Sequence, residues 1–196
     1  MRTSFSSATR GAGGPVVGTL RGVAGPTFRW ADAADVAAVV DLVESAYRGE
    51  ASRAGWTHEA DLVGGRRIDA DTLTAQMVAG TRVLLVETGG AIEACCALRD
   101  DGCGTVAFGM FAVVPTRQAR GTGSALLGEA ARIARDDWGA STLELDVIDV
   151  RAELIAWYER RGFVRSGGER SFPYGDDRFG DPFRDDLRFT VMTRAL

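Results

Sequence analysis

One stretch of the chain, residues 105–138, constrains the fold most, because it imposes a strand, a turn and a helix in succession. Residues 105–114 are rich in β-branched and aromatic side chains and too few to favour a helix, which predicts a buried strand. Pro115 ends the pairing of that strand. In residues 124–135 apolar side chains recur at every third and fourth position, which predicts an amphipathic helix. The glycine-containing turn at residues 118–123 therefore lies at a helix N-terminus.

That turn has the properties of an anion-binding site. The first amides of a helix have no acceptor within the helix, and the helix dipole places partial positive charge there. Gly121 and Gly123 lack a Cβ, so a phosphate can approach the main chain. Two glycines before a helix are also common in ordinary turns, so the motif gains weight only from its context. The residues expected to contact the anion are Gln118, Ala119, Arg120, Gly121, Thr122, Gly123 and Ser124.

Two other glycine-rich phosphate sites do not fit the residues. A P-loop requires Lys after its last glycine, and the sequence contains no Lys. A dinucleotide fingerprint requires three glycines near the start of a βαβ unit, whereas here there are two and the preceding segments indicate hairpins.

Length and composition indicate one domain with a distinct N-terminal segment. The 196 residues are 45% hydrophobic, which is enough for one sizeable core. Residues 1–25 contain no acidic residue and many Ser, Gly and Thr, so we expect a disordered extension there, with an organellar targeting segment as the alternative. Residues 26–196 are expected to form a single domain.

Charge and cysteine content argue against several partners. The net charge is -4 and the arginines are scattered, which does not favour nucleic acid as a partner. No apolar run approaches the length of about 20 residues that spans a membrane. Cys95, Cys96 and Cys103 lack the spacing of a metal site, so we expect no metal and mostly buried, reduced thiols in a cytoplasmic protein.

The remaining elements follow from periodicity and turn chemistry. A strand at residues 27–30 precedes a helix that Asp32 or Asp35 caps and that ends near Tyr47. A polar loop over residues 48–67 follows, and then a second helix that begins at Asp69 or Asp71. The further expected elements are hairpin strands at 82–87 and 91–98, a strand at 141–147 parallel to the central strand, a helix at 151–161, a strand at 163–165 and a closing strand at 186–193.

This order, together with two motifs about 35 residues apart, resembles the GNAT superfamily of N-acetyltransferases over residues 27–195. The motifs are the turn Gln118–Gly123 and the run Leu154-Ile155-Ala156-Trp157-Tyr158-Glu159-Arg160-Arg161-Gly162-Phe163. The resemblance implies a mixed α+β fold with a mostly antiparallel central sheet, a splayed parallel strand pair and flanking helices. It also implies acetyl-coenzyme A as co-substrate, bound by the central strand and its following turn.

The resemblance assigns roles to individual residues. Tyr158 occupies the position of the tyrosine that faces the thioester sulfur in the family. Main-chain groups of the central strand, around Phe111 to Val113, are expected to hold the oxyanion, and Gly109 makes a bulge there plausible. At the position of Arg151, many family members have an Asn that reaches the cofactor. A cofactor contact from Arg151 would therefore depart from the family pattern.

Acetyl transfer also requires a neutral amine. Deprotonating a lysine-like amine at pH 7 costs about 4.6 kcal/mol, whereas deprotonating an α-amine costs about 1 kcal/mol. A side-chain amine therefore needs a base more than an α-amine does. The candidate bases are Glu93, Asp146 and Glu59, and the sequence does not choose among them.

The acceptor is expected between the loop that contains Trp56 and Glu59 and the C-terminal connection that contains Tyr174. Both segments combine aromatic side chains with carboxylates, which favours a small-molecule primary amine of bulky aromatic or peptide-like character over an acid. The alternative is an inactive GNAT-like module that binds an acyl-coenzyme A as a sensor. The sequence does not decide the oligomeric state, and a homodimer is compatible with it.

Overall fold

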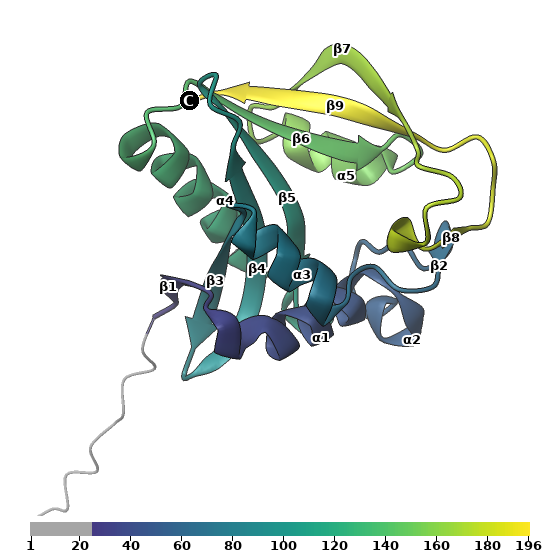
Figure 1. Ribbon diagram of the computed structural model, residues 1–196, viewed down its shortest axis with the longest axis horizontal. Helices are drawn as coiled ribbons and strands as arrows, with labels where there is room; N and C mark the ends of the chain where they lie inside the picture. Colours follow the sequence, from purple (N-terminus) through teal and green to yellow (C-terminus); the bar gives the residue numbers. More distant parts are fainter. Residues whose placement is uncertain (1–24) are drawn as a thin grey trace, which may run out of the picture.

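The computed structural model describes residues 25–196, in which one large sheet carries most of the fold (Figure 1). The strands of this sheet are β1 (Thr27–Trp30), β3 (Arg82–Thr88), β4 (Ala91–Asp100), β5 (Thr105–Val113), β6 (Thr142–Ile148), β7 (Val164–Ser171) and β9 (Arg188–Ala195). The α-helices are α1 (Val36–Tyr47), α2 (Gly49–Ser52), α3 (Ala70–Val78), α4 (Thr122–Arg132) and α5 (Ala152–Glu159). The extension expected at residues 1–25 lies outside the described residues, apart from Gly25.

The seven strands lie in the order β1-β3-β4-β5-β6-β9-β7. Every neighbouring pair is antiparallel except β5 with β6, which is parallel. The prediction of a mostly antiparallel sheet with one parallel pair is therefore confirmed. Strand β7 extends well beyond the predicted residues 163–165. A small sheet of β2 (Val63–Gly64) and β8 (Asp181–Pro182) was not predicted, since two-residue strands leave no periodic pattern.

Helices cover both faces of the sheet. Buried residues of α1 and α3 form one core with β3, β4 and β5, and buried residues of α4 and α5 form another on the opposite face. The helix starts have the expected acidic caps: Asp69 accepts from the Thr72 amide at 2.7 Å, and Asp32 caps a 3-10 turn that leads into α1. The core arrangement leaves the junction of β5 and β6 between the two helix layers.

The parallel pair is joined over a short distance only. Strands β5 and β6 pair at Thr105–Ala107 and Thr142–Glu144, and beyond these residues they diverge (Figure 1). The remaining edge of β5 that faces β6 therefore has no strand partner. This splay, expected from the family resemblance, opens the centre of the sheet.

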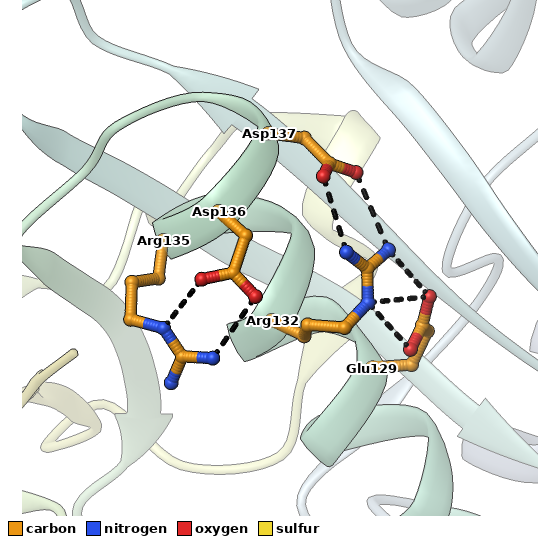
Figure 2. A network of polar contacts seen from close by, with 5 residues as sticks. All are labelled: Glu129, Arg132, Arg135, Asp136 and Asp137. Atoms are coloured by element: carbon orange, nitrogen blue, oxygen red, sulfur yellow. Dashed lines mark hydrogen bonds and ion pairs between the residues drawn. The ribbon is translucent and has the colours of Figure 1, made fainter.

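The C-terminal end of α4 continues into a π-helical turn at Ile133–Asp137. Arg132 donates to Glu129 on one side and to Asp137 on the other, so one guanidinium spans the change of helix type (Figure 2). Arg135 pairs separately with Asp136. These side chains are 25–53% exposed, so solvent screens each pair and its contribution to stability is small.

Two of the three thiols are buried. Cys95 and Cys96 lie in the cores on opposite faces of β4, whereas Cys103 is exposed. Within residues 25–196, no helix combines the length and the apolar character needed to cross a membrane.

Candidate active site

The central strand β5 contains a bulge where β6 turns away. Met110 and Phe111 together oppose the single residue Cys96 of β4. Met110 adopts a left-handed φ of 45°, a conformation that costs energy for a residue with a side chain. The bulge was expected around residues 111–113 with Gly109 as its flexible point. The structure places it one residue earlier, and the left-handed residue is Met110.

The strand beyond the bulge directs a free amide toward the splay. The Val114 N–H donates to the Glu93 carbonyl of β4 at 2.9 Å. Since successive amides of a strand point to opposite edges, the Val113 amide faces away from β4, toward the gap that β6 leaves. The Tyr47 hydroxyl donates to the Phe111 carbonyl at 2.9 Å and fastens α1 to the bulge.

The turn after β5 presents the N-terminus of α4. Ala119 and Gly121 adopt left-handed φ values of 61° and 92°, and Gly121 is the residue that caps α4. A side chain at Gly121 would meet no protein atom within 4 Å, so the space above its main chain is open. A Cβ at Gly123 would lie 3.1 Å from the Phe111 ring. These observations fit a ligand that lies against the amides of the turn.

Gln118 connects this turn to the loop before β2. Its side-chain oxygen accepts from the Trp56 amide at 2.9 Å, and its side-chain nitrogen donates to the Val113 carbonyl at 3.3 Å. A Cβ at Gly55 would lie 2.5 Å from the Gln118 oxygen and would displace it. Gln118 therefore positions the loop in addition to lining the site.

Arg161 brings a positive charge to the start of α4. Its guanidinium donates to the Ser124 hydroxyl at 2.7 Å and to the Trp157 carbonyl at 3.0 Å. Its Cζ lies 3.5 Å from the centroid of the Trp157 ring, a cation–π contact. Burial lowers the pKa of Arg161 from its ordinary value. Within residues 25–196 the side chain forms no ion pair, so its charge is available to an anion at the helix N-terminus.

Tyr158 lies in an aromatic cluster on α5 and is 4% exposed. Its ring contacts those of Phe111, Trp157 and Phe163 at centroid distances of 6.4, 5.1 and 5.4 Å. Burial raises the pKa of Tyr158 well above its ordinary value, and nearby Tyr47 raises it further. The hydroxyl therefore keeps its proton at neutral pH.

Glu59 lies in a buried cluster of charges next to Tyr47, whose carbonyl accepts from the Glu59 amide. Its two carboxylate oxygens accept from Arg151 at 2.6 Å and from Arg48 at 2.7 Å. Arg151 also donates to the Thr57 hydroxyl at 2.7 Å. Burial by itself would raise the pKa of Glu59, but the charges of Arg151, Arg67 and Arg48 outweigh it and hold the pKa below its usual value. Glu59 is therefore an ionised partner of arginines.

A cavity of about 330 Å³ joins these features. It extends from the α4 N-terminus past the bulge to Arg151 and Tyr158. Its volume is within the range typical of ligand sites. Its lining includes many of the predicted residues: Trp56, Phe111, Val113, Gln118, Ala119, Gly121, Gly123, Ser124, Arg151 and Tyr158.

Other predicted residues lie outside this lining. The Glu93 side chain, near the start of β4, lies 3.7 Å from the guanidinium of Arg117 and does not line the cavity. Asp146 is held by Arg170 of β7 at 2.6 Å. Arg120 is exposed on the turn.

Thr122, the first residue of α4, also lies outside the lining. Tyr174 packs on Phe172, and its hydroxyl accepts from the Leu187 amide at 2.6 Å. Glu59 does not line the cavity, but it pairs with Arg151, which does.

Among the lining residues that were not predicted for the site are Tyr47, Trp157 and Arg161. Tyr47 ends the apolar stripe of α1, and Trp157 precedes Tyr158, so both patterns also indicate a core residue. Arg161 carried one signal, because it follows Trp157 by four positions and hence lies on the same helical face.

Comparisons with known proteins agree with this geometry. Residues 79–165 match a family model described as an acetyltransferase (GNAT) domain. A search of curated protein sequences found no match. Among solved structures, the ribosomal-protein-S18-alanine N-acetyltransferase from Escherichia coli matches with 19% identity and a TM-score of 0.63, over 87% of this chain and 93% of that one.

Two further solved structures are similar. The yncA protein from Salmonella typhimurium, determined with its cofactor acetyl-CoA, shows 22% identity and a TM-score of 0.62 over 88% of this chain and 95% of that one. Nourseothricin acetyltransferase shows 25% identity and a TM-score of 0.50 over 59% of this chain, and the match spans 65% of that protein.

Proposed function

From the match of residues 79–165 to a GNAT acetyltransferase domain, we propose that the protein transfers the acetyl group of acetyl-coenzyme A directly to the primary amine of a small molecule. The observation that carries this proposal is the single cavity that connects the open α4 N-terminus with Tyr158 beside the splay of β5 and β6. Donor and acceptor can meet there, so the amine itself can attack the thioester and no nucleophilic side chain of the enzyme is required.

The residues present fit acetyl-coenzyme A. The amides from Arg120 to Ser124 and the guanidinium of Arg161 are suited to the diphosphate, because they combine unpaired donors with positive charge. The splayed edge of β5 offers main-chain groups to an extended thiol-bearing arm. When bound, acetyl-coenzyme A supplies an activated thioester, and the protein supplies position and proton transfer.

The residues around the bulge are suited to stabilise charge. The Val113 amide faces the gap between β5 and β6, so it can donate to the carbonyl oxygen of the acetyl group. Tyr158 lines the same cavity and is the proposed general acid for the leaving thiolate.

The amine must reach the cavity in its neutral form. Among the described residues, no carboxylate lines the cavity, and Glu59, which pairs with the lining residue Arg151, has both oxygens occupied by arginines. A proton from the amine therefore leaves through water, which favours amines whose pKa lies close to the working pH. Glu93 and Asp146, proposed as bases from the sequence, are occupied by Arg117 and Arg170.

The loop over the cavity favours a small acceptor. Gln118 holds the Trp56 amide, and Arg151 holds Thr57 and Glu59, so the loop is fastened at two points. A folded protein substrate would have to displace it. The buried thiols Cys95 and Cys96 suit the reducing cytoplasm, where we propose that the enzyme works.

The release of free coenzyme A tests this function. Purified protein is mixed with acetyl-coenzyme A and a panel of small primary amines, and a thiol reagent follows the product. We expect amine-dependent release well above the hydrolysis seen without amine, and the acetylated amine by mass spectrometry. Release that no amine increases would contradict the proposal, and a peptide with a free N-terminus tests the protein-substrate alternative.

A further inference from the structure

The charges around the acceptor end of the cavity are unbalanced. Arg48, Arg67 and Arg151 surround Glu59, and within residues 25–196 no other carboxylate pairs with any of these guanidinium groups. The Glu44 carboxylate accepts the main-chain amides of Arg67 and Ile68 at 2.6 and 2.8 Å. Even with Glu44 counted, positive charge is in excess.

Several arginine donors in this cluster have no partner. Arg151 lines the cavity, and its hydrogen bonds to Glu59 and Thr57 use two of the five N–H groups of a guanidinium. Arg48 is 7% exposed, and its Nε is buried without a hydrogen-bond partner. Arg48 does not line the cavity, so it adds positive charge behind the lining, whereas the free donors of Arg151 can contact an anion directly.

Arg67 adds charge beside the cavity wall. Its guanidinium lies 5.3 Å from the centroid of the Tyr47 ring, and Tyr47 itself lines the cavity. The side chain forms no ion pair within residues 25–196. An anion near Tyr47 would therefore be attracted by Arg67 as well as by Arg151, and it would meet no carboxylate on the lining.

From this arrangement we infer that the acceptor is an amine that also carries a carboxylate, as a free amino acid does, and that Arg151 receives the carboxylate while Arg67 attracts it from behind Tyr47. A planar carboxylate matches the fork of donors that a guanidinium offers. Glu59 acts as a positioning residue, since it fixes the orientation of Arg151. The inference rests on the proposed function and assigns the class of its acceptor.

An acceptor that carries a carboxylate differs from the cationic amine that the sequence favours. Glu59 was expected to bind an ammonium group, but two arginines neutralise it. Trp56 remains on the lining and can contact the body of the acceptor. The acceptor site thus combines aromatic surface with positive charge.

The test compares each of the 20 standard amino acids with its carboxamide, which keeps the amine and the side chain but lacks the negative charge. Binding is measured by calorimetry on the protein saturated with coenzyme A, and turnover is measured separately with acetyl-coenzyme A. The carboxamide amine is less basic, so the intrinsic chemistry favours the carboxamide. We expect the best acid to bind at least about tenfold more tightly than its carboxamide, a difference near 1.4 kcal/mol.

Matched variants locate the effect. Arg67→Gln should reduce the preference for the acid several-fold, and Arg151→Gln should abolish it, while Arg66→Gln, an exposed neighbour, should leave it unchanged. Circular dichroism and the thermal unfolding midpoint report that each variant is folded. Equal or tighter binding of the carboxamides, or no binding of any acid, would overturn the inference.

The two proposals fail in different ways. If carboxamides or uncharged amines are acetylated while acids show no advantage, the acetyltransferase function stands and the carboxylate site is wrong. If acids bind selectively but no amine is acetylated, the carboxylate site stands and the amine-transfer function is wrong.

Discussion

The guanidinium of Arg161 donates a 2.7 Å hydrogen bond to the hydroxyl of Ser124, 37 residues away in the sequence, and so places a positive charge at the N-terminus of α4. A helix N-terminus already attracts anions through its unpaired amides and its dipole. The added charge, fixed over the Trp157 ring, makes this end of the cavity the proposed anchor for the phosphates of coenzyme A.

Arg161→Ala should weaken acetyl-coenzyme A binding by about one to two orders of magnitude, as expected for loss of a charge-assisted contact. The loss should be much smaller for S-acetylpantetheine, which lacks the phosphates. Calorimetry with both ligands checks this. Arg160→Ala removes an exposed neighbouring arginine and serves as the control. Equal losses for the two ligands would mean that Arg161 acts only through packing.

Gly121→Val should reduce acetyl-coenzyme A affinity strongly, because the added side chain would project into the open space above the turn. Val also strains the backbone, since Gly121 has a φ of 92°. Gly139→Val introduces comparable strain at a φ of 69° far from the cavity and should cost stability without affecting affinity. Unchanged affinity in a folded Gly121→Val protein would place the phosphates elsewhere.

Tyr158→Phe should lower kcat by about one to two orders of magnitude and leave acetyl-coenzyme A affinity nearly unchanged, since general acids contribute about 10² to 10⁴ and water substitutes in part. Because the pKa of Tyr158 is raised, its protonated form persists to higher pH. The wild-type rate should therefore rise with pH as the amine deprotonates and show no decline up to about pH 10. Wild-type kcat in the Phe variant would identify Tyr158 as a packing residue.

Trp56 and Tyr174 were both predicted to contact the acceptor, and the structure separates them. Trp56 lines the cavity, whereas Tyr174 packs on Phe172 and accepts from Leu187. Trp56→Ala should therefore raise the acceptor KM several-fold without changing acetyl-coenzyme A affinity. Tyr174→Ala should leave the acceptor KM unchanged at equal folded fraction, and the reverse pattern would move the acceptor to the C-terminal connection.

Glu59→Gln should destabilise the fold by about 3–5 kcal/mol, because it leaves buried arginines without their counter-charge. The pKa of Glu59 is depressed in the folded state, so its contribution is present above the unfolded pKa and is lost as the pH falls through the folded value. The wild-type unfolding midpoint should thus fall below about pH 4.5 more steeply than that of Glu59→Gln. Glu50→Gln, whose side chain is 91% exposed, should behave like wild type.

Short-range chemistry controls the features that could be predicted from the sequence. Residues 105–132 fold as a strand, turn and helix as predicted, because the β-branched run, Pro115 and the glycine turn each act on neighbouring residues. The π-helical turn at Ile133–Asp137 was not predicted. The hairpin at Gly89 and Gly90 follows for the same reason, since both residues adopt the left-handed φ that the turn requires.

Which charged side chains form ion pairs depends on the tertiary structure. Glu59 pairs with Arg151 across 92 residues, and Asp146 pairs with Arg170 across 24, so two candidate bases became the partners of arginines. A carboxylate at a polar position of a strand or a loop has the same local pattern whether it faces substrate or a salt bridge. Its partner depends on how the chain closes long loops, which no local pattern reveals. The same closure brought Arg161 to Ser124 and opened the cavity where β5 and β6 part.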